Sequence, residues 1–155
     1  MRLTLHFDGS CWPNPGGLAK YGWTLHTPSG DHSGHGFAGE GPHVSNNYAE
    51  FYAMAEGLSL ALAVVRHGGS IEVLGDSEVA IKIMQGAYKA RKDKLYWPQY
   101  DRCMKLLKCL HDLGIYVEFK WIPREQNQEA DTLSKLLTTD PVSPVLIEEA
   151  EELLK

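Results

Sequence analysis

The sequence predicts an α/β fold: a five-stranded mixed sheet, its first three strands antiparallel and the later ones parallel, with helices on both faces. Apolar and polar residues alternate in three segments near the N-terminus, at about 2–10, 21–26 and 32–38, with the two-residue period of half-buried strands. The period becomes helical over about 46–67, and short strand-like and helix-like segments then alternate. A chain of 155 residues is enough for one domain with a sizeable core.

The first segment brings a carboxylate to the end of a strand. Asp8 follows Phe7 and leads into a turn rich in Gly, Asn and Pro. Strands seldom contain Asp, because a buried charge is costly without a partner. The side chain therefore either caps the turn or binds something, and a metal ion is the obvious partner. His32 and His35 lie on the polar third strand with no third ligand nearby, so we expect them at the surface rather than in a metal site.

The long helix and the elements after it complete the expected fold. Glu50 falls in the first turns of the helix, off its apolar stripe. Trp97 precedes Pro98, which disfavours helix at Trp97, and we expect its ring to anchor the core. Strands separated by helices imply parallel crossovers. The later elements are expected at about 71–74 (strand), 78–85 (helix), 98–113 (helix), 115–121 (strand) and 127–137 (helix).

Charge is distributed unevenly along the chain. Residues 140–155 contain five acids and one base, and we expect them to form an acidic amphipathic helix packed on a catalytic body at 1–139. Residues 82–108 contain eight bases against two acids. This run is either a solvated helical face or a patch that contacts phosphates, and composition does not decide between the two.

The cysteine pattern and hydropathy favour a cytoplasmic protein. Cys11, Cys103 and Cys109 are odd in number and lack a CxxC spacing, which argues against a disulfide framework and against a zinc site. No apolar run reaches the roughly 20 residues that a membrane helix needs, and the N-terminus leads directly into a strand. We expect no membrane partner and a free-standing monomer.

Four acids are predicted to converge at one edge of the sheet. Asp8 and Asp76 end strands that a right-handed crossover would place side by side, Glu50 would lean across from the long helix, and Asp131 would approach from the last helix of the body. Such carboxylates repel one another unless a cation neutralises them, and an all-oxygen ligand set suits Mg²⁺ or Mn²⁺. Two such ions roughly 4 Å apart can activate a water and stabilise the leaving oxygen of a phosphodiester.

Four sequence blocks carry these acids: DGSCWPNPGG, SNNYAEFYAM, LGDSEVAIK and NQEADTLSK. In this order they resemble the signature blocks of the type 1 ribonuclease H family, over about residues 1–137. The resemblance implies a ribonuclease H-like fold and an endonuclease that hydrolyses the RNA strand of RNA/DNA hybrids, with two metal ions, leaving a 5′-phosphate. It makes Asp8, Glu50, Asp76 and Asp131 both the metal ligands and the catalytic residues.

The resemblance also implies substrate contacts in the minor groove and at the 2′-hydroxyls of the RNA strand. Asn is suited to this because it both donates and accepts hydrogen bonds, as the 2′-hydroxyl does. Asn46 and Asn47 could also serve as helix caps, and the two roles are compatible. Ser45, at that helix terminus, could take a phosphate. The candidate substrate-binding residues are Cys11, Asn14, Ser45, Asn46, Asn47, Ser77 and Asn127.

Two departures from the family pattern stand out. Many members carry a His in the loop before the last helix, but here no His occurs from 114 to 131, as in archaeal-type loops. Arg124 is our candidate for the mobile charged catalytic group in that loop, although a plain exposed Arg fits as well. A longer basic protrusion found in some members is replaced by the short segment 87–96.

Three alternatives remain open at this point. Another nuclease of the ribonuclease H superfamily is disfavoured because proofreading exonucleases place Asp-x-Glu on the first strand, where this chain has Asp8-Gly9-Ser10. A non-catalytic ribonuclease H-like nucleic-acid-binding module usually lacks one of the acids. The chain could also be a domain of a reverse transcriptase.

Overall fold

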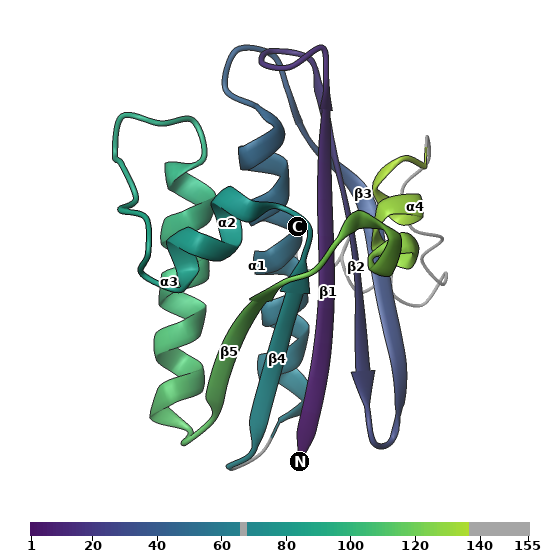
Figure 1. The fold of residues 1–155 in the computed structure, drawn as a ribbon, viewed down its shortest axis with the longest axis vertical. Coiled ribbons are helices and arrows are strands. Elements are labelled where there is room, and N and C mark those ends of the chain that lie inside the picture. The colour runs from purple at the N-terminus through teal and green to yellow at the C-terminus, as the bar shows by residue number, and fades with distance from the viewer. Residues whose placement is uncertain (66–67, 137–155) are drawn as a thin grey trace, which may run out of the picture.

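The computed structural model describes residues 1–65 and 68–136, which form one mixed sheet with helices packed against it (Figure 1). The strands are joined in the order β3-β2-β1-β4-β5; β1 pairs antiparallel with β2 and β2 with β3, whereas β4 pairs parallel with β1 and β5. The predicted five-stranded mixed sheet is confirmed. The elements are β1 (Arg2–Trp12), β2 (Leu18–Thr27), β3 (Gly30–Glu40), α1 (Asn46–Val64), β4 (Ser70–Gly75), α2 (Glu78–Met84), α3 (Trp97–Asp112), β5 (Tyr116–Trp121), the 3₁₀ turn η1 (Arg124–Gln126) and α4 (Gln128–Ser134).

Helices cover both faces of the sheet, as predicted. Helix α1 lies against the apolar face of β1, because a Cβ at Gly57 would come within 2.4 Å of the Leu5 side chain. Helix α4 lies against the other face, where a Cβ at Gly22 would come within 2.6 Å of its backbone. Figure 1 shows α4 apart from α1, α2 and α3, across the sheet. Successive side chains of a strand point to opposite faces, so β1 contributes alternately to the core and to the surface beneath α4.

The core lies between the sheet and α1 and α3. Leu5 and Phe7 are fully buried there, as are Phe51 and Met54 of α1. Burying a side chain of this size contributes roughly 1.5–3 kcal/mol. This packing holds the end of β1 rigidly against α1.

Several local expectations were wrong. Tyr96 is the buried aromatic residue at the start of α3, whereas Trp97 is half-buried and begins the helix, which has Pro98 in its first turn. His35 is not at the surface but is 7% exposed, since α4 also packs over β3.

The bounds of three elements also differ from the prediction. Strand β1 extends to Trp12 because its turn residues continue the ladder with β2, as in the pair Cys11–Ala19. Helix α1 ends at Val64 and α4 at Ser134, before the expected limits.

Two further expectations concern the ends of the chain and membranes. The predicted acidic helix at 140–155 lies outside the described residues. Among the helices that the structure describes, none has both the length and the apolar character needed to cross a bilayer.

Candidate active site

The structure brings three of the four predicted carboxylates together. Asp8, Glu50 and Asp76 each offer an oxygen atom, and these atoms lie within 4.8 Å of one another. The parallel pairing of β1 with β4 causes this for the two aspartates, since Phe7 lies opposite Gly75 and each is followed by an Asp. The carboxyl ends of these neighbouring strands therefore meet at one edge of the sheet.

Glu50 reaches the cluster because Gly9 lets α1 lie directly on β1. A Cβ at Gly9 would lie 2.2 Å from the carbonyl carbon of Ala49, so a larger residue would push the helix away. The backbone N–H of Gly9 donates to Oε1 of Glu50 at 3.0 Å. The other oxygen, Oε2, is buried without a hydrogen-bond partner among the described residues. That oxygen is available as a ligand.

The electrostatics of the cluster call for a cation. Burial raises the pKa of Asp8 to about 7; a hydrogen bond from Ser134 opposes the shift, and the charges of Asp76 and Asp131 add to it. Burial, followed by the charge of Asp8, raises the pKa of Glu50 well above its usual range. Buried carboxylates that repel one another are stabilised in their ionised form by a cation. Mg²⁺ and Mn²⁺ are the hard cations that prefer such oxygen ligands. The residues present therefore fit such an ion.

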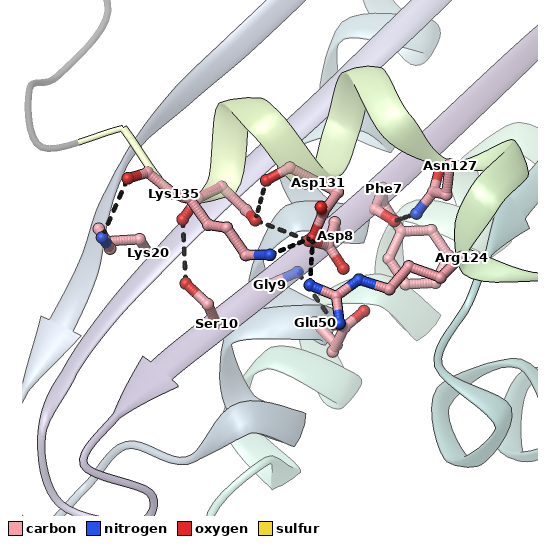
Figure 2. A network of polar contacts seen from close by, with 11 residues as sticks. Phe7, Asp8, Gly9, Ser10, Lys20, Glu50, Arg124, Asn127, Asp131 and Lys135 are labelled. Atoms are coloured by element: carbon pink, nitrogen blue, oxygen red, sulfur yellow. Dashed lines mark hydrogen bonds and ion pairs between the residues drawn. The ribbon is translucent and has the colours of Figure 1, made fainter.

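Asp131 lies beside the cluster and is paired with two cations (Figure 2). Its Oδ1 is 2.9 Å from Nζ of Lys135, four residues along α4, and 3.4 Å from the guanidinium of Arg124. Partial burial would raise the pKa of Asp131, but Lys135 and then Arg124 outweigh it and lower that pKa. Asp131 is thus held as a carboxylate at the side of the cluster.

Helix α4 is tied to β1 by side-chain hydrogen bonds (Figure 2). The hydroxyl of Ser134 donates to Oδ2 of Asp8 at 2.6 Å, and the hydroxyl of Ser10 donates to the carbonyl of Ser134 at 2.9 Å. At the start of the helix, Nδ2 of Asn127 donates to the carbonyl of Phe7 at 2.9 Å. Asn127 is 1% exposed. In the structure Asn127 holds the start of α4 to β1, and its substrate contact stays a prediction.

Helix α4 packs on the sheet at Gly22, and replacing this glycine with a larger residue should disturb the site. Gly22 pairs with Asp8, and a Cβ there would lie 2.6 Å from the carbonyl oxygen of Ala130 and the N–H of Ser134. Since backbone must move, we expect Gly22→Ala to lower the free energy of unfolding by about 1–3 kcal/mol, measured by urea denaturation. Gly36→Ala is the control, because the atoms nearest to a Cβ there belong to the Tyr21 side chain, at 3.2 Å, rather than to the backbone. If Gly22→Ala and Gly36→Ala have the same free energy of unfolding, this packing is contradicted.

The carboxylates open into a cleft with a volume of about 490 Å³ that also holds most of the predicted substrate-binding residues. Asn46 lies in this cleft and accepts, through Oδ1, the N–H of Cys11 at 2.8 Å. This contact joins the end of β1 to the start of α1. The predicted residues that line the cleft with the four acids are Cys11, Asn46, Asn47, Ser77 and Arg124.

Two predicted residues lie outside the cleft and support α1. The Oδ1 of Asn14 accepts the N–H of Asn46 at 2.9 Å, and the hydroxyl of Ser45 accepts the N–H of Tyr48 at 3.1 Å. Both line a neighbouring groove with Lys89 and Lys94. Ser77 has a second role as well, because its hydroxyl caps α2 by accepting the N–H of Ala80 at 3.2 Å.

Sequence reasoning missed several residues of the site. The missed residues that line the cleft are Gly9, Ser10, Trp12, Lys20 and Lys135, and Ser134 bonds to Asp8. The spacing of four residues from Asp131 to Lys135 is a signal that could have been used, since charges four apart on a helix are neighbours. Nothing in the sequence pattern distinguishes Ser134 from an ordinary helical Ser.

The chain matches known proteins over most of its length. The family model described as reverse transcriptase-like matches residues 6–137. RNase H1 from the halophilic archaeon Halobacterium salinarum NRC-1 is 28% identical, with a TM-score of 0.71 over 86% of this chain and 94% of that one. LC11-RNase H1, from compost and solved in complex with an RNA/DNA hybrid, is 26% identical, with a TM-score of 0.67 over 84% and 92%.

A third similar structure is the N-terminal RNase H domain of Rv2228c from Mycobacterium tuberculosis. It is 22% identical, with a TM-score of 0.72 over 99% of each chain, a likeness that shows the fold. The family model covers well over half of the sequence and includes all four acids. The chain therefore belongs to the reverse transcriptase-like family and has the ribonuclease H fold.

Proposed function

We propose that this protein is a metal-dependent endoribonuclease that hydrolyses the RNA strand of RNA/DNA hybrids and leaves a 5′-phosphate. The observation that carries the proposal is the cluster of Asp8, Glu50 and Asp76, whose oxygens lie within 4.8 Å of one another in an open cleft. The similarity to RNase H1 structures, one of them bound to an RNA/DNA hybrid, supports the choice of substrate.

Asp8, Glu50 and Asp76 would hold the divalent ions, Mg²⁺ or Mn²⁺, with Asp131 at the side. A pair of such ions supplies activation of a water and stabilisation of the leaving oxygen. The protein supplies a rigid frame for the ligands: the N–H of Gly9 orients Glu50, and the hydroxyl of Ser134 orients Asp8. Preorganised ligands of this kind lose little freedom when the ion binds.

The polar wall of the cleft would recognise the RNA strand. Asn47 lies in the cleft with a side chain that can both donate and accept, which suits a 2′-hydroxyl. Asn46 uses its Oδ1 on the N–H of Cys11, so its Nδ2 is the group that remains for a substrate. Asn14 and Ser45 act by holding this wall in place, and the adjacent groove with Lys89 and Lys94 offers cations to a phosphate backbone.

Arg124 is the proposed mobile charged group of the catalytic loop. Its side chain is 65% exposed, and its guanidinium lies 3.4 Å from Asp131, so it can leave that carboxylate without breaking the core. We expect Arg124→Ala to lower kcat about tenfold with little change in KM, because the group acts on the reacting phosphate rather than on the duplex. Steady-state kinetics measure this, and an unaltered kcat would show that Arg124 is an exposed residue without a catalytic role. Glu125→Ala, at the next exposed position of η1, is the control.

The proposed compartment and oligomeric state are the cytoplasm and a monomer. All three cysteines are free thiols in the structure, and two of them are buried. Free thiols persist in a reducing compartment. Size-exclusion chromatography with light scattering tests the monomer.

A panel of labelled duplexes tests the proposed activity. RNA/DNA, RNA/RNA and DNA/DNA duplexes of one sequence are incubated with the protein in Mg²⁺, in Mn²⁺ and in EDTA. We expect internal cleavage of the RNA strand of the hybrid alone, and only with metal. Binding of the hybrid without cleavage would favour a non-catalytic module, and cleavage of DNA/DNA would favour another nuclease of the superfamily.

A further inference from the structure

The rim of the cleft carries an exposed tryptophan that the proposed reaction does not require. Trp12 ends β1, is 84% exposed, and lines the same cleft as the carboxylates. Exposed indole rings are uncommon, because burying them is strongly favourable. A ring in this place is therefore a candidate contact for whatever occupies the cleft.

Trp12 stands in a row with the metal-binding acid of its strand. Asp8, Ser10 and Trp12 alternate along β1 and project from one face; the first two both contact Ser134 of α4. Four residues of strand span about 13 Å. The indole therefore lies well to one side of the reacting centre, at a distance of several nucleotide steps.

A cation lies beside this row. Lys20 pairs with Ser10 across the β1–β2 ladder and lines the cleft. Its Nζ donates to the carbonyl of Lys135 at 3.3 Å, and within residues 1–65 and 68–136 it has no carboxylate partner. Lys135, in contrast, has its charge paired with Asp131. Lys20 thus offers a positive charge to a phosphate near the indole.

We propose that Trp12 and Lys20 bind a single-stranded extension that flanks the RNA/DNA hybrid, with the indole stacking on an unpaired base. Inside a duplex each base face is covered by its neighbours, whereas an unpaired base offers a face to an exposed ring. A flat aromatic ring with an adjacent cation is the usual combination for single-stranded nucleic acid. This inference rests on the proposed function and names the substrate feature that the site prefers: the junction where a hybrid meets a single strand.

The test compares hybrids that share one cleavage site and differ only at their ends. One is blunt, and the others carry an unpaired RNA or DNA extension on one side or the other. For the wild-type protein we expect the KM to be about 5- to 20-fold lower for a hybrid extended on one side than for the blunt hybrid, as one stacked base would produce. For Trp12→Ala the ratio of the two KM values should fall to near one, with the loss in KM rather than kcat.

Three variants make the result specific. Trp12→Phe keeps a stacking ring and should keep most of the preference. Lys20→Gln should reduce both the preference and its dependence on salt. Tyr116→Ala removes another exposed aromatic, 65% exposed, at the opposite end of β5 from the cleft, and should behave as the wild type.

The outcomes separate this inference from the proposed function. If the wild type cleaves hybrids but shows no preference for extended ones, or if Trp12→Ala keeps that preference, the inference is wrong and the nuclease assignment stands. An equal loss for blunt and extended hybrids would also overturn it, because the ring would then contact the duplex. If the wild type cleaves no hybrid, both fail together.

Discussion

Replacing Asp76 with Asn is expected to reduce cleavage of an RNA/DNA hybrid by more than about 100-fold. The substitution keeps the size of the side chain and removes a negative oxygen from the group of three that lies within 4.8 Å. Loss of outer-shell partners alone typically costs 10–100-fold in metal affinity or activity, so loss of a direct ligand should cost more. Single-turnover cleavage at saturating Mg²⁺ measures the effect.

Metal binding should be lost together with activity. We expect titration calorimetry with Mn²⁺ to show clear heat for the wild-type protein and little for Asp76→Asn. Asp112→Asn is the matched control, because Asp112 is an exposed carboxylate at the end of α3, away from the cleft. Cleavage that survives in Asp76→Asn at a near-normal rate would overturn the assignment of the metal site.

The thermal stability of the metal-free protein is expected to fall as pH rises from about 5 to 8. The pKa of Asp8 is raised to about 7, and that of Glu50 is also raised. The stabilisation from such groups is present below the unfolded-state pKa of about 4 and is lost as pH rises through the folded-state pKa. Between these values the folded protein holds protons that the unfolded chain has released, so each group lowers the free energy of unfolding by up to about 1.4 kcal/mol per pH unit.

Scanning calorimetry in EDTA at several pH values tests this, with Asp8→Asn as the comparison. The variant should show a flatter pH dependence, and Mg²⁺ should restore the wild-type melting temperature most at high pH. His6, whose pKa is lowered by burial and then by His26, contributes in the opposite direction. Its contribution is common to both proteins and largely cancels in the difference. A wild-type profile as flat as that of Asp8→Asn would contradict the raised pKa.

The centre of the site could be predicted from the sequence because it follows from strand order. Two acids at the ends of consecutive parallel strands must meet, and the observed pairing of Phe7 with Gly75 places Asp8 beside Asp76. The position of Glu50 was predictable only in outline. Its burial depends on the close approach of α1 to β1 at Gly9. The hydrophobic pattern of the sequence does not show how closely two elements approach each other.

The second face of the sheet could not be predicted to the same extent. Asn127 looked like a substrate contact and is buried, while Ser134 looked like an ordinary helical residue and bonds to Asp8. Both depend on where the short helix α4 lies, and a Cβ at Gly22 would leave no room for the helix at that place. Hydrophobic patterns describe which face of an element is buried, but they carry little information about polar contacts between elements distant in sequence.

The bonds between β1 and α4 have a consequence for synthesis of the protein. Phe7 and Asn127 are 120 positions apart, and Asp8 and Ser134 are 126 apart. A ribosome makes β1 first and α4 near the end of the described residues, so the serine that orients Asp8 emerges long after the aspartate itself. A partly translated chain therefore lacks the completed carboxylate frame. The hydrogen bond that orients Asp8 can therefore form only after α4 has been made, 126 residues after Asp8 itself.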